Sequence, residues 1–222
     1  FAATSSYASP IFTQTGYSAS QIGQGTTNGY GTVISEGSDV YFTSGGGGLV
    51  YHIDAAGTQT NFVTTTGTSM GLLADNGTLY VGSTTGDIST YDLTTGASQG
   101  NFVSFGGSTV NEMELANANS SFYGSMLVTT NTGLYAIDLV TKAQTTIATG
   151  LFNNVEFTAN GDFYSSTYTG GLSHYNSNGT LDYTMSISGV DGIAIHDLTG
   201  DIFLANASTK SILAFDSTTQ TT

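Results

Sequence analysis

The sequence predicts an all-β protein, and three observations support this prediction. Apolar runs of four to six residues recur along the chain, each too short for a helix, and none shows a 3.6-residue period. Clusters of Gly, Asn, Asp, Ser and Thr separate the runs, as turn residues separate antiparallel strands. Residues 191–216 contain three such runs, at 192–195, 201–205 and 211–215. The remaining chain repeats this three-run unit.

The third run of the unit ends in an acid or an amide, and this ending recurs at a nearly constant interval. The endings are Asp54, Asp92, Asp138, Asn176 and Asp216. They lie 38, 46, 38 and 40 residues apart. A period near forty with several strands per repeat is typical of a β-propeller, whose sheets pack radially and cover one another. The sequence therefore predicts a single β-propeller of five blades, each with four antiparallel strands.

The predicted blades divide the chain into consecutive segments. We expect residues 1–30 to form an N-terminal arm with a closing strand, and residues 31–222 to form the propeller. The expected blades are residues 31–66, 67–108, 109–150, 151–188 and 189–222.

The last predicted blade lacks a fourth strand, because only polar residues follow Asp216. The N-terminal arm holds a spare apolar strand at residues 11–14, and an uncovered strand edge invites aggregation. We therefore expect this strand to complete the last blade and close the propeller. The residues expected at this closure are Ile11, Phe12, Ile212, Leu213 and Phe215. Pairing within one chain, which we favour, gives a closed monomer, whereas pairing between chains gives a homo-oligomer or filament.

Residues 191–216, DGIAIHDLTGDIFLANASTKSILAFD, resemble the repeat of NHL/SMP-30-type propellers, and residues 72–92 are the next best match. The likeness covers about residues 31–216 and is one of fold. Functions vary widely on propellers, so the resemblance by itself implies little about activity.

Polar residues precede several first strands at equivalent places when the repeats are aligned. They are Glu112, Asn154 and Asp191, together with Asn111 and Asn153. In SMP-30-like propellers, carboxylates and amides around the central channel hold a divalent metal, so the resemblance implies a metal site here. Hard oxygen ligands suit calcium, which is the one cofactor that the sequence suggests.

The charge balance excludes several classes of partner. The chain has 16 Asp+Glu and 2 Lys+Arg, giving a net charge of −14. Binding of nucleic acid or of an anionic membrane surface needs cations that the chain lacks, and no apolar run is long enough to insert across a bilayer. Scarce Lys, no Cys and abundant Thr, Ser, Gly and Asn resemble the composition of secreted or surface-sorted microbial proteins. We therefore expect a secreted, extracellular or cell-surface location.

No catalytic residue can be assigned from the motifs. The segment 67–71 formally matches G-x-S-x-G around Ser69, but a nucleophile elbow needs a following helix, and another predicted strand follows here. Tyrosines recur once per repeat in the third strands, where they are expected in the core rather than on a sugar-binding surface. They are Tyr51, Tyr91, Tyr135 and Tyr175.

The preferred interpretation of function is a non-enzymatic structural or interaction module at the cell surface or outside the cell, with self-assembly into a filament or surface layer as an open option. The alternative is a metal-dependent, calcium-using lactonase-type hydrolase acting at the channel rim. A second alternative is a carbohydrate-binding propeller, and the sequence names no small ligand or glycan.

Overall fold

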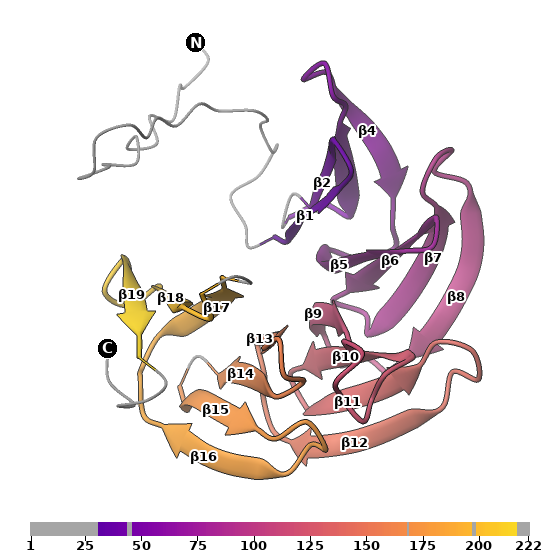
Figure 1. Cartoon of the computed structure of the whole chain (residues 1–222). Helices are drawn as coiled ribbons and strands as arrows, with labels where there is room; N and C mark the ends of the chain where they lie inside the picture. The colour runs from indigo at the N-terminus through magenta and orange to yellow at the C-terminus, as the bar shows by residue number, and fades with distance from the viewer. Residues whose placement is uncertain (1–30, 44–45, 168, 197–198, 217–222) are drawn as a thin grey trace.

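The computed structural model describes residues 31–43, 46–167, 169–196 and 199–216, whose regular secondary structure consists of β-strands alone. These strands form five antiparallel sheets, which follow one another around an axis in Figure 1. The prediction of an all-β, five-bladed propeller is therefore confirmed.

Each blade is a meander whose strands pair in chain order. Blade one contains β1 (Val33–Glu36), β2 (Asp39–Thr43), β3 (Leu49–Ile53) and β4 (Gln59–Thr64). Blade two contains β5 (Ser69–Asp75), β6 (Thr78–Ser83), β7 (Asp87–Asp92) and β8 (Ser98–Ser104). Blade three contains β9 (Val110–Leu115), β10 (Ser125–Thr130), β11 (Gly133–Asp138) and β12 (Gln144–Thr149). Blade four contains β13 (Asn154–Phe157), β14 (Phe163–Thr167), β15 (Gly171–Tyr175) and β16 (Leu181–Met185). Blade five contains β17 (Val190–Ile195), β18 (Ile202–Asn206) and β19 (Ser211–Phe215).

The first strand of every blade lies innermost and the fourth strand, where it is described, lies outermost (Figure 1). Blade five has three strands among the described residues. The strand predicted to complete this blade, residues 11–14 with Ile11 and Phe12, falls outside the described residues.

The acids that end the third strands hold the turn into the fourth strands. One oxygen of Asp92 accepts hydrogen bonds from the backbone N–H groups of Thr94 and Thr95 and from the Thr95 hydroxyl, at 2.7–3.1 Å. Asp138 makes the same three bonds with Val140 and Thr141. These bonds lower the pKa of both carboxyls, with the bonds from Thr95 and Thr141 the largest causes. The recurring acid in the sequence is therefore a turn-forming residue.

A two-residue turn joins the first two strands of blade two. Asp75 pairs with Thr78, so Asn76 and Gly77 form the whole loop. Both have positive φ, 47° and 76°. This combination defines a type I′ turn, which Asn-Gly favours and whose twist matches the flanking strands.

Consecutive blades pack face to face, and each junction buries one apolar cluster. We call the face of a blade that packs on the following blade its forward face, and the opposite face its backward face. A forward third-strand residue and a backward first-strand residue share the cluster at every junction. These pairs are Val50 with Leu72, Ile88 with Met113, Leu134 with Val155, and Leu172 with Ile193. The repeated pairing makes the junctions variants of one interface.

Candidate functional site

The inner strands bring the predicted polar residues into contact between neighbouring blades. Asn111, Asn153 and Asp191 each lie two residues before the backward-face residue of their first strand, so they hold equivalent places. The Asn153 amide nitrogen donates to Oδ1 of Asp191 at 3.2 Å, joining blade four to blade five. The sequence put these residues before the first strands, whereas Asn111, Glu112, Asn154 and Asp191 lie within them.

The next residue along each inner strand forms a second link. Nδ2 of Asn154 donates to Oε2 of Glu112 at 3.2 Å, joining blade four to blade three. Asn111 lies outside this link, because its amide nitrogen donates to the backbone carbonyl of Phe152 at 2.7 Å. We call Glu112, Asn153, Asn154 and Asp191 the axial cluster.

Glu112 has an unusual protonation equilibrium. Burial raises the pKa of its carboxyl from 4.5 to about 7, and the nearby charge of Glu156 raises it further. Hydrogen bonds from the Met113 backbone and the Asn154 amide act in the opposite direction but are outweighed. A carboxyl that titrates near neutrality can accept or donate a proton under physiological conditions.

Two oxygens next to the axial cluster lack a hydrogen-bond partner among the protein atoms. They are Oδ1 of Asn154 and Oγ of Ser166, both buried. Asn154 and Ser166 are paired across β13 and β14, so their side chains share one face of blade four. A buried oxygen without a partner is costly, and it is usually satisfied by a bound water or ion. Amide, hydroxyl and carboxylate oxygens are the donor types that hard cations prefer.

The axial cluster depends on amides as much as on acids. Among the residues that the structure describes, no three His, Asp or Glu side chains lie close enough to one another to hold a metal ion. A cation bound here would need the oxygens of Asn154 and Ser166 in addition to a carboxylate.

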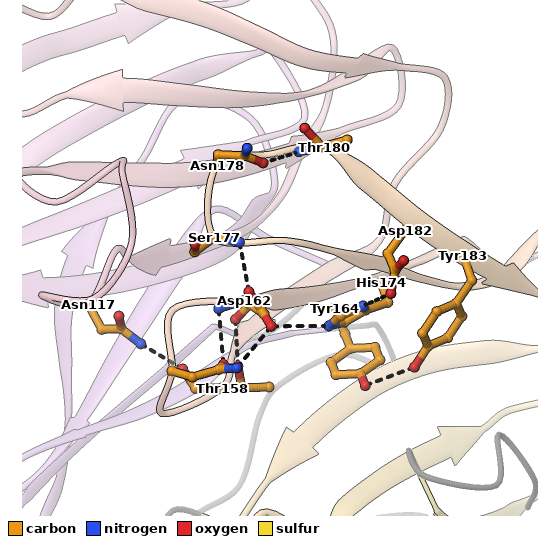
Figure 2. Close-up of polar contacts among 11 residues, drawn as sticks. Asn117, Thr158, Asp162, Tyr164, His174, Ser177, Asn178, Thr180, Asp182 and Tyr183 are labelled. Atoms are coloured by element: carbon orange, nitrogen blue, oxygen red, sulfur yellow. Dashed lines mark hydrogen bonds and ion pairs between the residues drawn. The ribbon is translucent and has the colours of Figure 1, made fainter.

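A second polar cluster surrounds His174, and sequence reasoning did not identify it as a site. Figure 2 shows His174 between Asp162 and Asp182, with Tyr164 and Tyr183 beside it. The His174 Nδ1 atom lies 3.1 Å from Asp182, and its Nε2 atom lies 3.8 Å from Asp162. The ring stacks on Tyr183, with the ring centroids 5.0 Å apart.

Blade one repeats much of the His174 cluster. His52 lies 3.0 Å from Asp39 and stacks on Tyr41 with a centroid separation of 4.8 Å. The two histidines hold equivalent places in their blades, and in each case the ring stacks on a tyrosine. The spacing Asp-x-Tyr at the start of both second strands is the signal that could have identified the whole unit.

The formal nucleophile Ser69 has a structural role. Its side chain is fully buried, and its hydroxyl donates to the backbone carbonyl of Leu49 at 3.0 Å. It begins strand β5 rather than a turn before a helix. Tyr51, Tyr91 and Tyr175 are also buried, which gives them core positions rather than a sugar-binding surface.

The forward face of blade five is the largest departure from the repeat. Its residues alternate along three strands, and all are apolar: Ala194, Phe203, Ala205, Ile212 and Ala214. Ile212 corresponds to Val50, Ile88, Leu134 and Leu172, which are all 0% exposed. Ile212 is 66% exposed and Phe203 is 39% exposed. Blade five therefore presents a face that every other blade buries.

Phe215 and Leu213, which had been expected at the closure with Ile212, lie on the opposite face. Phe215 is buried, and its ring lies 6.1 Å from the ring of Tyr164 in blade four. Leu213 packs partly buried in the same junction. Of these three residues, only Ile212 belongs to the open face.

No known protein family and no curated protein matches this sequence. Solved structures with a similar fold include the WD40 β-propeller domain of Doa1, with a TM-score of 0.69 at 12% identity over 83% of this chain and 62% of that chain. The extracellular domain of BT3049 from B. thetaiotaomicron matches with a TM-score of 0.65 at 14% identity, over 92% of this chain and 31% of that chain. The extracellular domain of BT4673 from B. thetaiotaomicron gives 0.64 at 16% identity, over 82% of this chain and 26% of that chain.

The likeness is one of fold. This chain spans less than two thirds of the length of each of these three structures. Two of these structures are extracellular domains. In the described part of the chain, no helix has the length and apolar character needed to cross a bilayer.

Proposed function

We propose that this chain is a secreted or cell-surface β-propeller that acts as a non-enzymatic interaction module through the forward face of blade five. The observation that carries the proposal is Ile212, which is 66% exposed where four equivalent residues are fully buried. Exposed apolar surface of this kind marks contact sites on soluble proteins. The extracellular origin of two similar structures and the acidic, Lys-poor composition support the location.

Among the described residues no strand pairs with the outer edge of β19, and this edge adds a second route to association. An edge strand presents unpaired backbone groups that can accept another strand. We propose that residues 11–14 supply this strand, as the sequence predicts, within the chain or between chains. This pairing would cover the edge of blade five and leave the side chains of its forward face available.

Hydroxyl-radical labelling tests whether the forward face is open. We expect Phe203 to oxidise readily at a dilution where the chain is monomeric, because its ring is 39% exposed. Phe163, which is 0% exposed, is the matched internal reference. Equal protection of the two rings at that dilution would show that the chain covers its own face and would refute the proposed function.

A second candidate function is cation binding at the axial cluster, leading to a calcium-dependent hydrolase of the lactonase type. The unpartnered Oδ1 of Asn154 beside Glu112 is the observation that favours it. The resemblance of the repeat to NHL/SMP-30-type propellers points the same way. When bound, a divalent ion would polarise a carbonyl substrate, and the Glu112 carboxyl could exchange a proton with that substrate.

Calorimetric titration with calcium tests the second candidate directly. We expect heat of binding in the wild-type chain and its loss in Asn154→Leu, which removes the free oxygen. Asn178→Leu, in an exposed turn of blade four, is the control variant. Absence of binding at millimolar calcium would exclude this site.

A further inference from the structure

We propose that the forward face of blade five receives the backward face of blade one of a second copy of this chain, so that copies join head to tail. This inference rests on the proposed function, because it names the partner of the same face. The contact would repeat, between molecules, the junction that already links the blades within one molecule.

The proposed contact would bring together one residue from each end of the array of blades. Every junction combines a forward third-strand residue with a backward first-strand residue, as in Ile88 with Met113. Continuing the series leaves Ile212 of blade five and Val33 of blade one. Val33 corresponds to Leu72, Met113 and Val155, which are at most 2% exposed, yet Val33 is 66% exposed. The two ends of the array thus expose the two halves of one interface.

The forward face of a blade also contacts the next blade through its second strand. In each blade, one second-strand residue pairs with the buried third-strand residue. At three junctions this second-strand residue meets the innermost segment of the next blade. The Thr43 hydroxyl donates to the Met70 carbonyl, and the Thr129 hydroxyl donates to the Asn153 carbonyl. At the third, a side chain on Gly82 would clash with Val110.

Ala205 holds this position in blade five, where it pairs with Ile212. Instead of contacting a further blade, it lines a hollow of about 330 Å³. Asp191, Asn206, Lys210, Ser211 and Ile212 complete much of the lining. The hollow lies where a following blade would place its first strand. Its lining combines apolar side chains with polar ones, and in this proposal it receives the inner strand of blade one, which begins at Val33.

The positions of blades one and five indicate which copy of the chain can supply the inner strand of blade one. Close contacts between strands of different blades run from each blade to the next, with β1 and β2 against β5 at one end and β13 and β14 against β17 at the other. Blades one and five lie at the two ends of the arc in Figure 1. A contact that joins two different faces is heterologous, so it builds a ring or an open filament rather than an isolated two-fold dimer.

Light scattering on complementary variants tests the pairing. The wild-type mass is expected to rise with concentration. Ile212→Asp and Val33→Asp are each expected to remain monomeric, and an equimolar mixture should form a dimer, because each variant keeps the face that the other lacks. Val140→Asp changes an exposed apolar residue that lies in a turn outside both faces, and it should behave as wild type. A monomeric wild type at every soluble concentration, or a mixture that does not associate, overturns the inference.

Cysteine cross-linking identifies the copy involved and remains informative if an Asp variant folds poorly. The chain has no Cys, so the double variant Val33→Cys with Ile212→Cys places its thiols at these two positions alone. Oxidation should produce covalent dimers and larger species on a non-reducing gel. A cross-link that leaves the mass monomeric means that the chain closes on itself, and the absence of any cross-link means that the faces do not meet. Either result overturns the inference. If Phe203 is nevertheless readily labelled by hydroxyl radicals, the proposed function stands and the forward face binds a different partner.

Discussion

The Asn154 amide and the Glu112 carboxyl join the innermost strands of blades three and four through a hydrogen bond of 3.2 Å. Glu112 carries the raised pKa of about 7 that burial causes, whereas Asn154 keeps an oxygen without a protein partner. One hydrogen bond thus connects a buried acid with a raised pKa to an amide whose own oxygen is buried without a hydrogen-bond donor.

Ionisation of Glu112 should destabilise the fold as pH rises. Its pKa is raised on folding, so its neutral form is favoured in the native state, and the associated stability is present below about pH 4.5 and lost as pH rises through about 7. Glu112→Gln should therefore match wild type near pH 4 and exceed it near pH 8 by at most about 3 kcal/mol, because one pKa unit corresponds to about 1.4 kcal/mol. Urea unfolding at both pH values measures the difference.

Glu36→Gln is the matched control for this measurement, because Glu36 is an exposed carboxylate at the end of β1. The substitution should change the free energy of unfolding by at most about 0.5 kcal/mol, because the side chain is on the surface. A Glu112→Gln variant that follows the wild-type profile across this range would show that Glu112 does not titrate there.

Ile88 and Ile212 should respond differently to truncation although they hold the same place in their blades. Ile88→Ala removes a fully buried side chain from the junction of blades two and three, and it should cost about 2–5 kcal/mol. Ile212→Ala removes a side chain that is 66% exposed, so the monomer should change by at most about 0.5 kcal/mol. Chemical denaturation of dilute protein gives both values, and equal losses would show that something covers Ile212 within its own chain.

The third-strand aspartates should make the fold sensitive to acid. Hydrogen bonds to Asp92 and Asp138 lower their pKa values, so their stabilisation is present above the ordinary carboxyl pKa and is lost as pH falls through the lowered values. A double variant, Asp92→Asn with Asp138→Asn, should have a lower Tm than wild type at neutral pH. The gap should narrow as pH falls below the ordinary carboxyl range, because the wild-type carboxyls then become protonated.

Asp87→Asn provides the comparison, since the Asp87 side chain accepts one hydroxyl hydrogen bond, from Thr85, instead of holding a turn. Its Tm should differ little from wild type at either pH. If the double variant kept the wild-type Tm at neutral pH, the turns would not depend on these charges.

Removal of residues 1–16 tests the predicted closing strand. We expect the shortened chain to be less stable and more prone to aggregate, because the edge of β19 would lose its partner. Differential scanning calorimetry and light scattering would detect both effects. Unchanged Tm, solubility and mass would mean that Ile11 and Phe12 close nothing.

The sequence predicted the blades because each repeat carries its own local signals. Asp92 and Asp138 recur because each one caps a turn, and Asn76 with Gly77 encodes a turn type directly. The contacts of Asn153 with Asp191 and of Asn154 with Glu112 were also accessible, since aligning the first strands places equivalent residues side by side.

Other features of the site depend on three-dimensional surroundings that the sequence pattern does not express. Ile88 and Ile212 look alike in their repeats, and only the presence of a following blade distinguishes their exposure. The pKa of Glu112 depends on burial contributed by neighbouring blades. Asp182, which pairs with His174, lies in a fourth strand, where the repeat is least regular.

The succession of blades, each packed on its neighbours in the chain, also sets how the molecule would come apart. In such an array, stability is a sum of blade and junction contributions, so units with one neighbour open more easily than units with two. Among the described residues, β9 to β12 are flanked by a blade on both sides, whereas β17 to β19 adjoin blade four alone. Amide hydrogens in blade three should therefore exchange most slowly with solvent deuterium, and those in blade five should exchange sooner. A second copy bound to blade five would give that blade two neighbours. Amide exchange along β18 and β19 should then become slower as each new intermolecular junction forms.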